Sequence, residues 1–214
     1  MKKLFILSLL VFLLCGCTSI QEMSLEEIID NGTSSKLEVY NNYRKGYKYN
    51  VPKGLAVVDN SLYNEVLESN QYSYYLYVDA VSYYNKVIEK YNVDNNAYVS
   101  MPISYEDQYG YLEINVLSNN KYFIEIMYNY AKIEVIVRRE EDIKLAVANA
   151  ISVLSSVSFN DKILSNLLDE ETAQFKEYGF NIFETKKTES SILESIGSSE
   201  YEEDEDIYDI DLID

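Results

Sequence analysis

Three consecutive segments with alternating apolar and polar residues constrain the fold of this chain more than any other feature. They cover residues 111–117, 122–128 and 132–138, and turn-like residues separate them at 118–120 and 129–131. Alternation with a period of two is typical of strands that bury one face, and short polar connections favour hairpins. The segments therefore predict an antiparallel β-meander at about residues 111–138.

The two faces of this meander differ in composition. The apolar face takes one set of side chains from each strand: Leu112, Ile114 and Val116; Ile124 and Ile126; and Ile133, Val135 and Val137. The opposite face carries charged side chains: Glu113, Glu125, Glu134, Lys132 and Arg138. We expect the apolar face to be buried by the rest of the domain.

Helical periodicity follows the meander. The carboxylates at 140–142 favour a helix start, because they suit the positive end of the helix dipole. Apolar residues then recur at helical spacing through Val157, so we expect a long helix that covers the sheet. A second helix is expected from Asp161 to about Phe175. Near the other end of the chain, Ser24 and Glu27 match a capping box, which predicts a short helix ending near residues 31–32.

The segment between residues 37 and 96 gives weaker signals. We expect a strand at 37–40, a turn at 44–46, a strand at 47–51 and a short buried strand at 55–58. Residues 62–67 fit a helix or a strand, and the turn-like residues that follow favour a hairpin. Aromatic and β-branched residues predict a strand over 72–81, and a short helix is expected within 85–96.

The first seventeen residues predict where the chain is delivered. Two lysines precede an apolar run at 4–14, which has the length of a signal-peptide core and is too short to span about 30 Å of hydrocarbon. The sequence Leu14-Cys15-Gly16-Cys17 resembles the lipobox of bacterial prolipoproteins. This resemblance implies cleavage after Gly16 and lipidation of Cys17, and hence a lipid-anchored protein on the cell membrane that faces away from the cytoplasm. An ordinary secretory signal with a poor cleavage site is the alternative.

The fold class that follows is α+β, with an antiparallel sheet covered by helices after an N-terminal signal peptide. The expected organisation has four parts: a signal peptide at 1–16, a lipidated tether and short helix at 17–35, a single α+β domain at 36–184, and a polar linker with an acidic disordered tail at 185–214.

The charge of the chain excludes one class of partner. The full sequence has a formal net charge of −18, and removal of Lys2 and Lys3 with the signal peptide makes it about −20. Such a field repels nucleic-acid phosphate and anionic lipid headgroups, so we expect no nucleic-acid partner. Membrane attachment would then come from the lipid on Cys17, since two acyl chains are the number usually needed for stable anchoring.

The residue types that most enzymes use are scarce. The chain has no His and two Cys, and no phosphate-binding glycine loop or nucleophile elbow is found, so no catalytic residue, metal site or cofactor is expected. Catalysis would have to use the strand carboxylates Glu113, Glu125 and Glu134, two of which could flank a glycosidic bond. The simpler interpretation is a solvated sheet face on which these carboxylates pair with Lys132 and Arg138.

The C-terminal tail suggests a binding segment. Residues 198–214 carry nine carboxylates and no basic residue, which is typical of a disordered extension. Five large apolar side chains are interleaved with these carboxylates: Ile207, Tyr208, Ile210, Leu212 and Ile213. Interleaving of this kind is typical of segments that fold on a partner, so these residues are the candidate contact with another envelope or surface protein.

Two motifs carry a resemblance to a known family of domains. One is the aromatic strand Tyr47-Lys48-Tyr49-Asn50-Val51 running into Pro52-Lys53-Gly54, and the other is the stretch Ile151-Ser152-Val153-Leu154-Ser155-Ser156-Val157-Ser158-Phe159. Together they resemble PsbP/Mog1-like domains over roughly residues 46–160. The resemblance implies an α/β sandwich with an antiparallel sheet, and no particular reaction.

Two functions remain open at this point. The first is a membrane-anchored, non-catalytic lipoprotein whose domain and tail bind another protein, in assembly or adhesion. The alternative is a carboxylate-based hydrolase or small-ligand binder that uses the polar sheet face. A concave pocket lined by two of the three strand carboxylates would favour the second, and an ion-paired face would favour the first.

Overall fold

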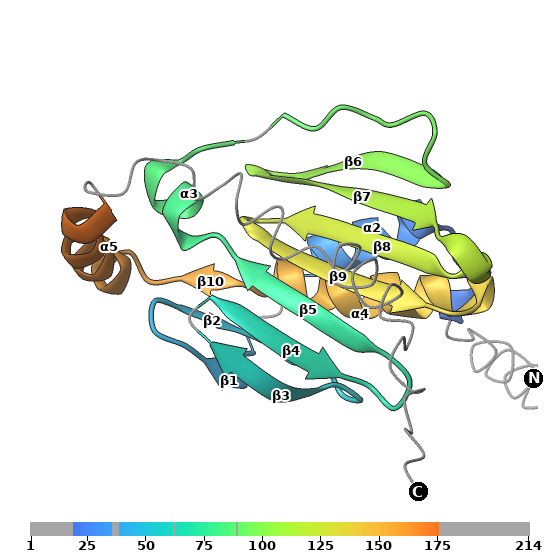
Figure 1. Cartoon of the computed structure of the whole chain (residues 1–214), viewed down its shortest axis with the longest axis horizontal. Coiled ribbons are helices and arrows are strands. Elements are labelled where there is room, and N and C mark those ends of the chain that lie inside the picture. The colour runs from blue at the N-terminus through green and yellow to red at the C-terminus, as the bar shows by residue number, and fades with distance from the viewer. Residues whose placement is uncertain (1–18, 36–38, 62, 89, 176–214) are drawn as a thin grey trace, which may run out of the picture. The chain divides into compact units, whose positions relative to one another are not determined.

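A computed structural model describes residues 19–35, 39–61, 63–88 and 90–175 (Figure 1). The chain divides into two compact units, residues 1–166 and 167–214. In the second unit the described part is 167–175, which continues a helix that begins in the first. The first unit has antiparallel sheets and several helices, which confirms the predicted α+β class.

A seven-stranded antiparallel sheet forms the body of the first unit. Its spatial order is β3 (Ala56–Ser61), β4 (Asn64–Glu68), β5 (Ser73–Val78), β9 (Ala131–Val137), β8 (Tyr122–Tyr128), β7 (Gln108–Val116) and β6 (Val99–Tyr105). The predicted meander is β7, β8 and β9, and its register places Ile114 opposite Ile124, which in turn faces Val135. These inward side chains are fully buried, because one face of the sheet is covered by helices.

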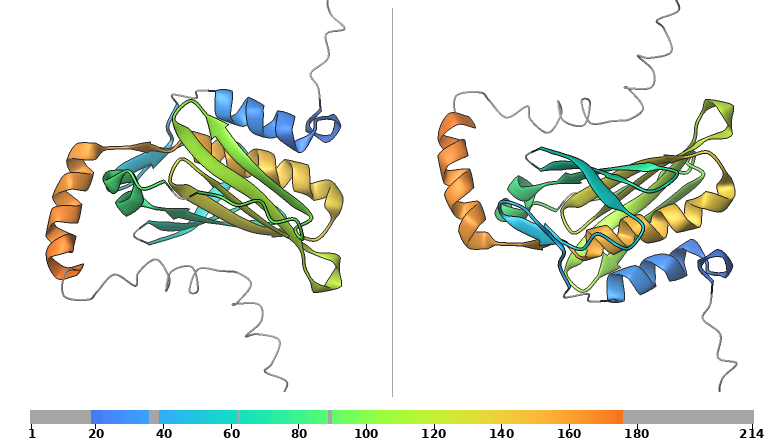
Figure 2. Two further views of the ribbon diagram at one scale, coloured as in Figure 1. Left: turned by 90° about the horizontal axis from the view of Figure 1, so that it is seen from above. Right: turned by 90° about the horizontal axis from the view of Figure 1, so that it is seen from below.

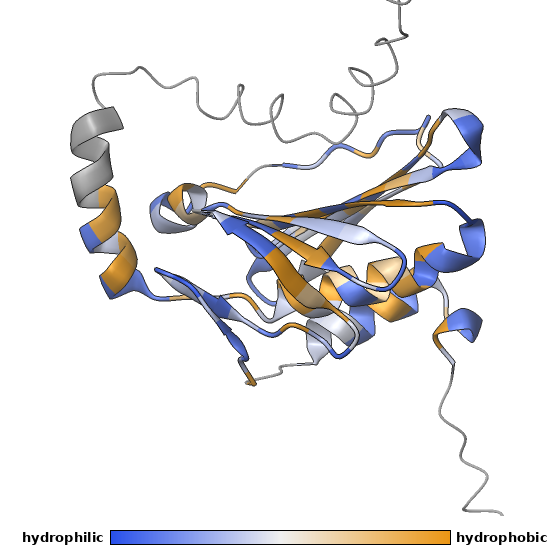
Figure 3. Cartoon of the chain, turned by 60° about the horizontal axis from the view of Figure 1, so that its bottom comes forward, coloured by the Kyte–Doolittle hydropathy of each residue, from blue (hydrophilic) through white to orange (hydrophobic). Residues whose placement is uncertain are grey.

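The helix layer lies on one side of this sheet, behind it in Figure 1 and visible from two further sides in Figure 2. It consists of α4 (Ile143–Ser155), which packs against β8 and β9, and α2 (Leu25–Ser34), which packs against α4. Short 3-10 turns precede both helices, η1 (Ile20–Glu22) before α2 and η3 (Glu140–Asp142) before α4. Figure 3 shows apolar and polar residues mixed along α4. Its buried residues, which include Val147, Ala150 and Leu154, pack against β8 and β9 as predicted.

A second, three-stranded sheet closes the core beside α4. It has the order β1 (Asn42–Tyr43), β2 (Tyr47–Tyr49) and β10 (Ser158–Phe159), all antiparallel. Tyr47 and Tyr49 of β2 are buried in the same core as the inner residues of the large sheet. The remaining helical elements are α3 (Ala80–Asn85), η2 (Ser118–Asn120) and α5 (Asp161–Phe175).

The predicted capping box at the start of α2 is confirmed. The Ser24 hydroxyl accepts a hydrogen bond from the Glu27 amide at 3.1 Å, and the Glu27 carboxylate accepts one from the Ser24 amide at 2.8 Å. The helix runs to Ser34, two residues past the expected end, and Gly32 within it lets α2 approach α4 closely. A Cβ at Gly32 would lie 2.5 Å from Ile151 Cγ2, so a larger residue would push the two helices apart.

Three local expectations were wrong. The first strand begins at Asn42, because Arg44 and the two residues after it close a hairpin onto β2; residues 39 and 40 are irregular, and part of the expected 37–40 strand lies outside the described residues. The expected buried strand at 55–58 is β3, which is largely exposed because it forms an edge of the sheet and shifts register at residue 58.

The third wrong expectation is the helix within 85–96. The helix comes earlier, as α3, because the Asp79 side chain caps it by accepting from the Ser82 amide at 2.9 Å. Lys86 ends α3 with a left-handed backbone conformation, and the described residues from 87 to 98 form no helix or strand. The predicted strand over 72–81 therefore stops at Val78. Strand β6, which has no counterpart among the expectations, completes the sheet beyond β7.

Candidate functional site

The predicted site residues fall into two groups. Cys17 lies outside the described residues, and so do the five apolar tail positions between 207 and 213. The strand carboxylates Glu113, Glu125 and Glu134 are described, and the sheet register brings them into one row across β7, β8 and β9. Glu125 stands directly opposite Glu113 on one side and Glu134 on the other. The prediction that these three carboxylates share the face away from the helices is therefore confirmed.

Lys132 bridges two of these carboxylates. Its ammonium nitrogen lies 3.1 Å from Glu125 and 2.6 Å from Glu134. The Tyr111 hydroxyl donates a further hydrogen bond to Glu125 at 2.6 Å. The predicted pairing with Lys132 is present, whereas Arg138 makes no ion pair with this row within the described part of the chain.

A tyrosine from the irregular segment 90–98 covers the third carboxylate. Tyr91 donates to Glu113 at 2.8 Å, and its ring stacks on Tyr111 with centroids 4.3 Å apart and planes 4° from parallel. The row is therefore less solvated than expected, because Lys132 and tyrosine side chains replace water around it. Glu134 is 2% exposed. No periodic pattern marks Tyr91 for this role, which depends on how an irregular segment folds back over the sheet.

The electrostatics of Glu125 do not suit a catalytic acid. Burial by itself would raise the pKa of Glu125, but Lys132 and the Tyr111 hydrogen bond outweigh it and hold the pKa below its ordinary value. The pKa of Lys132 is raised, because the two carboxylates outweigh the effect of its burial. A glycosidase needs a carboxyl whose pKa is raised enough to keep its proton near neutral pH. Glu125 has a lowered pKa and is therefore held in its ionised form.

We expect Glu125→Gln to change the pH dependence of stability. The pKa of Glu125 is lower folded than unfolded, so its contribution is complete above the ordinary pKa of 4.5 and is lost as pH falls through the lower folded value. At neutral pH the substitution should lower the free energy of unfolding by about 1–2 kcal/mol, the range for a hydrogen bond to a charged group. Urea unfolding between pH 7 and pH 3 measures the difference.

The difference between wild type and Glu125→Gln should shrink as the pH falls below 4.5. Glu68→Gln is the matched control, because Glu68 is an exposed carboxylate at the end of a strand in the same sheet. A difference that stays constant across this pH range would show that the ion pair with Lys132 contributes nothing.

The most buried carboxylate was missed by sequence reasoning. Glu65 on β4 faces the helix side of the sheet, and its side chain has no exposed surface. Arg44 donates to it from Nε at 2.9 Å and from Nη2 at 2.5 Å. Tyr47 and Tyr49 donate to its two oxygens at 2.9 and 2.7 Å. Burial and the adjacent Glu65 raise the pKa of both tyrosines, so they remain protonated donors.

This Glu65 cluster joins the two sheets, because its acceptor lies on β4 and its donors lie on or beside β2. One signal in the sequence could have located it. Glu65 precedes the buried Leu67 by two residues, and positions two apart on a strand share a face. A carboxylate on the inward face requires buried donors, and the Tyr47 and Tyr49 pair supplies them.

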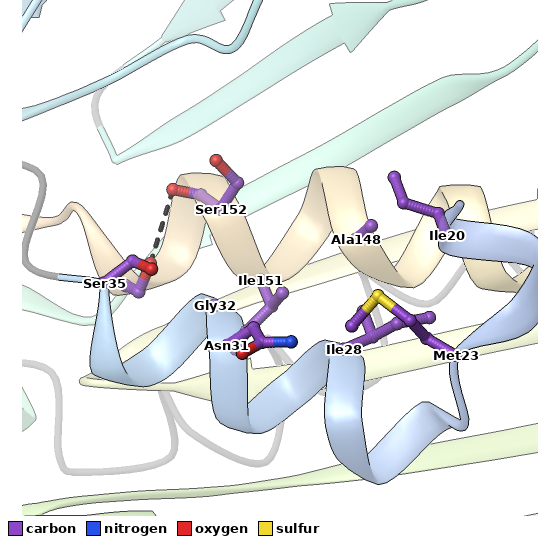
Figure 4. Close-up of a pocket in the computed structure, with 10 residues that line it drawn as sticks. Ile20, Met23, Ile28, Asn31, Gly32, Ser35, Ala148, Ile151 and Ser152 are labelled. Atoms are coloured by element: carbon purple, nitrogen blue, oxygen red, sulfur yellow. Dashed lines mark hydrogen bonds between the residues drawn. The ribbon is translucent and has the colours of Figure 1, made fainter. Parts of the chain in front are cut away.

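A groove between α2 and α4 is the third feature of interest (Figure 4). It has a volume of about 290 Å³ and a mainly apolar lining. Ile20 and Met23 lie at one end, and Ser35 and Ser152 lie at the other. None of the strand carboxylates lines it. The end with Ile20 is the one nearest in sequence to Cys17.

Comparisons with protein-family models, with curated proteins and with solved structures found no match to this chain. Among the described residues, no helix has both the length and the apolar character needed to cross a membrane. Within the same residues no group of three or more acidic or cysteine side chains is placed to hold a metal ion.

Proposed function

We propose that the protein is a membrane-anchored extracytoplasmic lipoprotein with a non-catalytic body that binds another envelope or surface protein. One observation carries the proposal: a turn that is hydrogen-bonded to the body begins only three residues after the cysteine of the lipobox-like sequence. The η1 turn starts at Ile20, and Ser19, two residues after Cys17, is its N-cap. A body joined so closely to the modified residue would be held near the membrane surface.

Contacts of η1 with α4 support this close attachment. The Lys144 ammonium donates to the Gln21 carbonyl at 2.9 Å, and the Gln21 side-chain amide donates to the Glu141 carbonyl at 3.2 Å. The capped helix α2 follows within two residues. The segment next to the anchor is therefore held directly against the helix layer of the body.

The paired carboxylates support a non-catalytic role. Each of the three is satisfied by a tyrosine or by Lys132. The described groove lies in the helix layer, away from them. No observation favours the alternative of a carboxylate-based hydrolase or a small-ligand binder on this face.

A PsbP/Mog1-like fold is part of the proposal. The two motifs behind that resemblance, which are separated by 96 residues, include strands β2 and β10. These strands are hydrogen-bonded neighbours, with Lys48 opposite Ser158 and Tyr47 opposite Phe159. Domains of this kind serve as binding and assembly modules, which agrees with the proposed role.

The anchor is tested by Cys17→Ser. We expect this substitution to abolish fatty-acid incorporation and the salt-resistant membrane fraction, because a body with a charge of about −20 has no electrostatic attraction to anionic lipid. The measurement is labelling with an alkyne fatty acid, followed by fractionation after a high-salt wash. Cys15→Ser is the control and should label normally, since Cys15 belongs to the removed segment. Labelling of Cys17→Ser at the wild-type level would refute the anchor.

The partner-binding role is tested on the tail. We propose that Ile207, Tyr208, Ile210, Leu212 and Ile213 become buried on a partner, while the surrounding carboxylates speed the encounter. Tyr208→Ala with Ile210→Ala should reduce partner capture from membranes at any ionic strength. Asp204→Asn with Asp206→Asn is the matched control, and it should mainly reduce the association rate and its dependence on salt. If the apolar double variant captures the same proteins as wild type, the tail is not the binding element.

A further inference from the structure

The groove between α2 and α4 is apolar where it approaches the N-terminal segment. Ile20 and Met23 form that end, and Ile28, Ala148 and Ile151 continue the apolar lining between the two helices (Figure 4). Ile20 remains 37% exposed. The close contact of Gly32 with Ile151 fixes the spacing of the helices and hence the width of the groove. Polar residues occur on its rim and at its far end, so the end near Ile20 is apolar and the opposite end is polar.

The length of chain between Cys17 and this end of the groove is short. The η1 turn is fixed to α4 through Gln21, so the positions of Ser19 and Ile20 are set by the body. An extended chain covers at most about 3.6 Å per residue, so Cys17 lies within roughly 11 Å of Ile20. An acyl chain attached there needs no long tether to enter the groove.

The charge around the groove disfavours a free lipid surface as its occupant. The exposed carboxylates of η1 and the first turns of α2 are Glu22, Glu26, Glu27 and Asp30. They would repel anionic headgroups. An acyl chain that is already covalently attached carries no such penalty, and its short tether gives it an effective concentration of about millimolar or higher.

We propose that the α2–α4 groove holds part of one acyl chain of the lipid on Cys17. This inference rests on the proposed lipidation. The volume of about 290 Å³ lies at the lower end of small-molecule sites, which begin near 300 Å³, so the groove takes part of one chain and leaves the other chain for the bilayer. Because stable anchoring usually needs two inserted chains, occupancy of the groove makes attachment weaker and more reversible.

Photo-crosslinking of the native lipidated protein tests this. Cells expressing the full chain are grown with a fatty acid that carries a diazirine near its end, and purified membranes are irradiated. Mass spectrometry first verifies the lipid on Cys17 and then maps the crosslinked peptides. The expected result is crosslinks to the groove residues of α2 and α4, such as Met23 and Ile151.

Filling the groove should remove these crosslinks. Ala148→Trp should lower their yield about tenfold, since exclusion of even two methylene groups removes that much occupancy. Asn31→Trp, at an exposed position on the rim, is a second variant that leaves the core intact. Leu145→Trp is the control on the same helix outside the groove, where Leu145 is 45% exposed, and it should crosslink as wild type.

The possible failures are distinguishable. A lipid on Cys17 with crosslinks confined to phospholipid would overturn the groove inference and leave the proposed anchor standing. Crosslinks that persist unchanged in both groove-filling variants would also overturn it. A chain with no lipid on Cys17 would overturn the proposed function itself.

Discussion

Gly110→Ala is expected to lower the free energy of unfolding by more than about 3 kcal/mol, because it forces two main chains apart where β7 pairs with the end of β8. A Cβ at Gly110 would coincide with the Met127 carbonyl group, 2.7 Å from its carbon, and would lie 2.8 Å from Tyr128 Cα. These are backbone atoms of β8, so no side-chain rotation can relieve the clash. Urea unfolding at neutral pH, with circular dichroism as the probe, measures the loss.

Gly54→Ala is the matched control for this prediction. Gly54 has a φ of +100°, and a Cβ there would meet no atom within 4 Å, so the substitution adds backbone strain without a clash. Its cost should be about 1–2 kcal/mol. An equal or smaller cost at Gly110 would contradict the close β7–β8 approach.

Glu65→Ala is expected to lower the free energy of unfolding by about 3–5 kcal/mol. The substitution removes the common acceptor of Arg44, Tyr47 and Tyr49 and leaves buried hydroxyl groups without that partner. The loss should appear in urea unfolding, together with weakened protection of the β2 and β10 amides from hydrogen exchange, because the cluster connects the small sheet to β4.

Glu68→Ala separates this effect from the loss of a carboxylate in general. Glu68 ends the same strand and is exposed, so its removal should change the free energy of unfolding by less than about 1 kcal/mol. A similarly small loss for Glu65→Ala would mean that the cluster is not a stabilising connection between the sheets.

The parts of the fold that the sequence predicted depend on local periodicity. The meander, the capping box of α2 and the buried face of α4 could each be predicted from residues two to four positions apart. The edge strand β3 was expected to be buried, because a short apolar run looks the same at an edge as in a core. The helix expected within 85–96 was wrong because the Asp79 carboxylate caps a helix that begins five residues earlier, at Ala80.

In the candidate site, too, only the residues that follow a local period could be predicted. The alternation of the meander was enough to place Glu113, Glu125 and Glu134 on one face. It could not show that Tyr91 would cover Glu113, because that contact depends on an irregular segment with no period. The spacing of Glu65 and Leu67 could have placed Glu65 on the inward face. Its pairing with Tyr47 and Tyr49 depends on how the small sheet packs against β4, and that packing leaves no regular spacing in the sequence.

The N-terminal end of the chain ties these features to the proposed function. Cys17, the η1 turn and the α2–α4 groove follow one another along the chain, and η1 is hydrogen-bonded to α4. Because η1 begins three residues after Cys17, a lipid on that residue would bring the helix layer close to the membrane surface. The strand carboxylates lie on the other face of the sheet, away from that layer.

The intact mass of the protein purified from membranes shows whether the mature chain carries a lipid on Cys17. We expect a chain that begins at Cys17 and carries the added mass of a diacylglyceryl group, with fragmentation placing that mass on the first residue. A mature chain that begins at another residue, or one that begins at Cys17 without lipid, would contradict it.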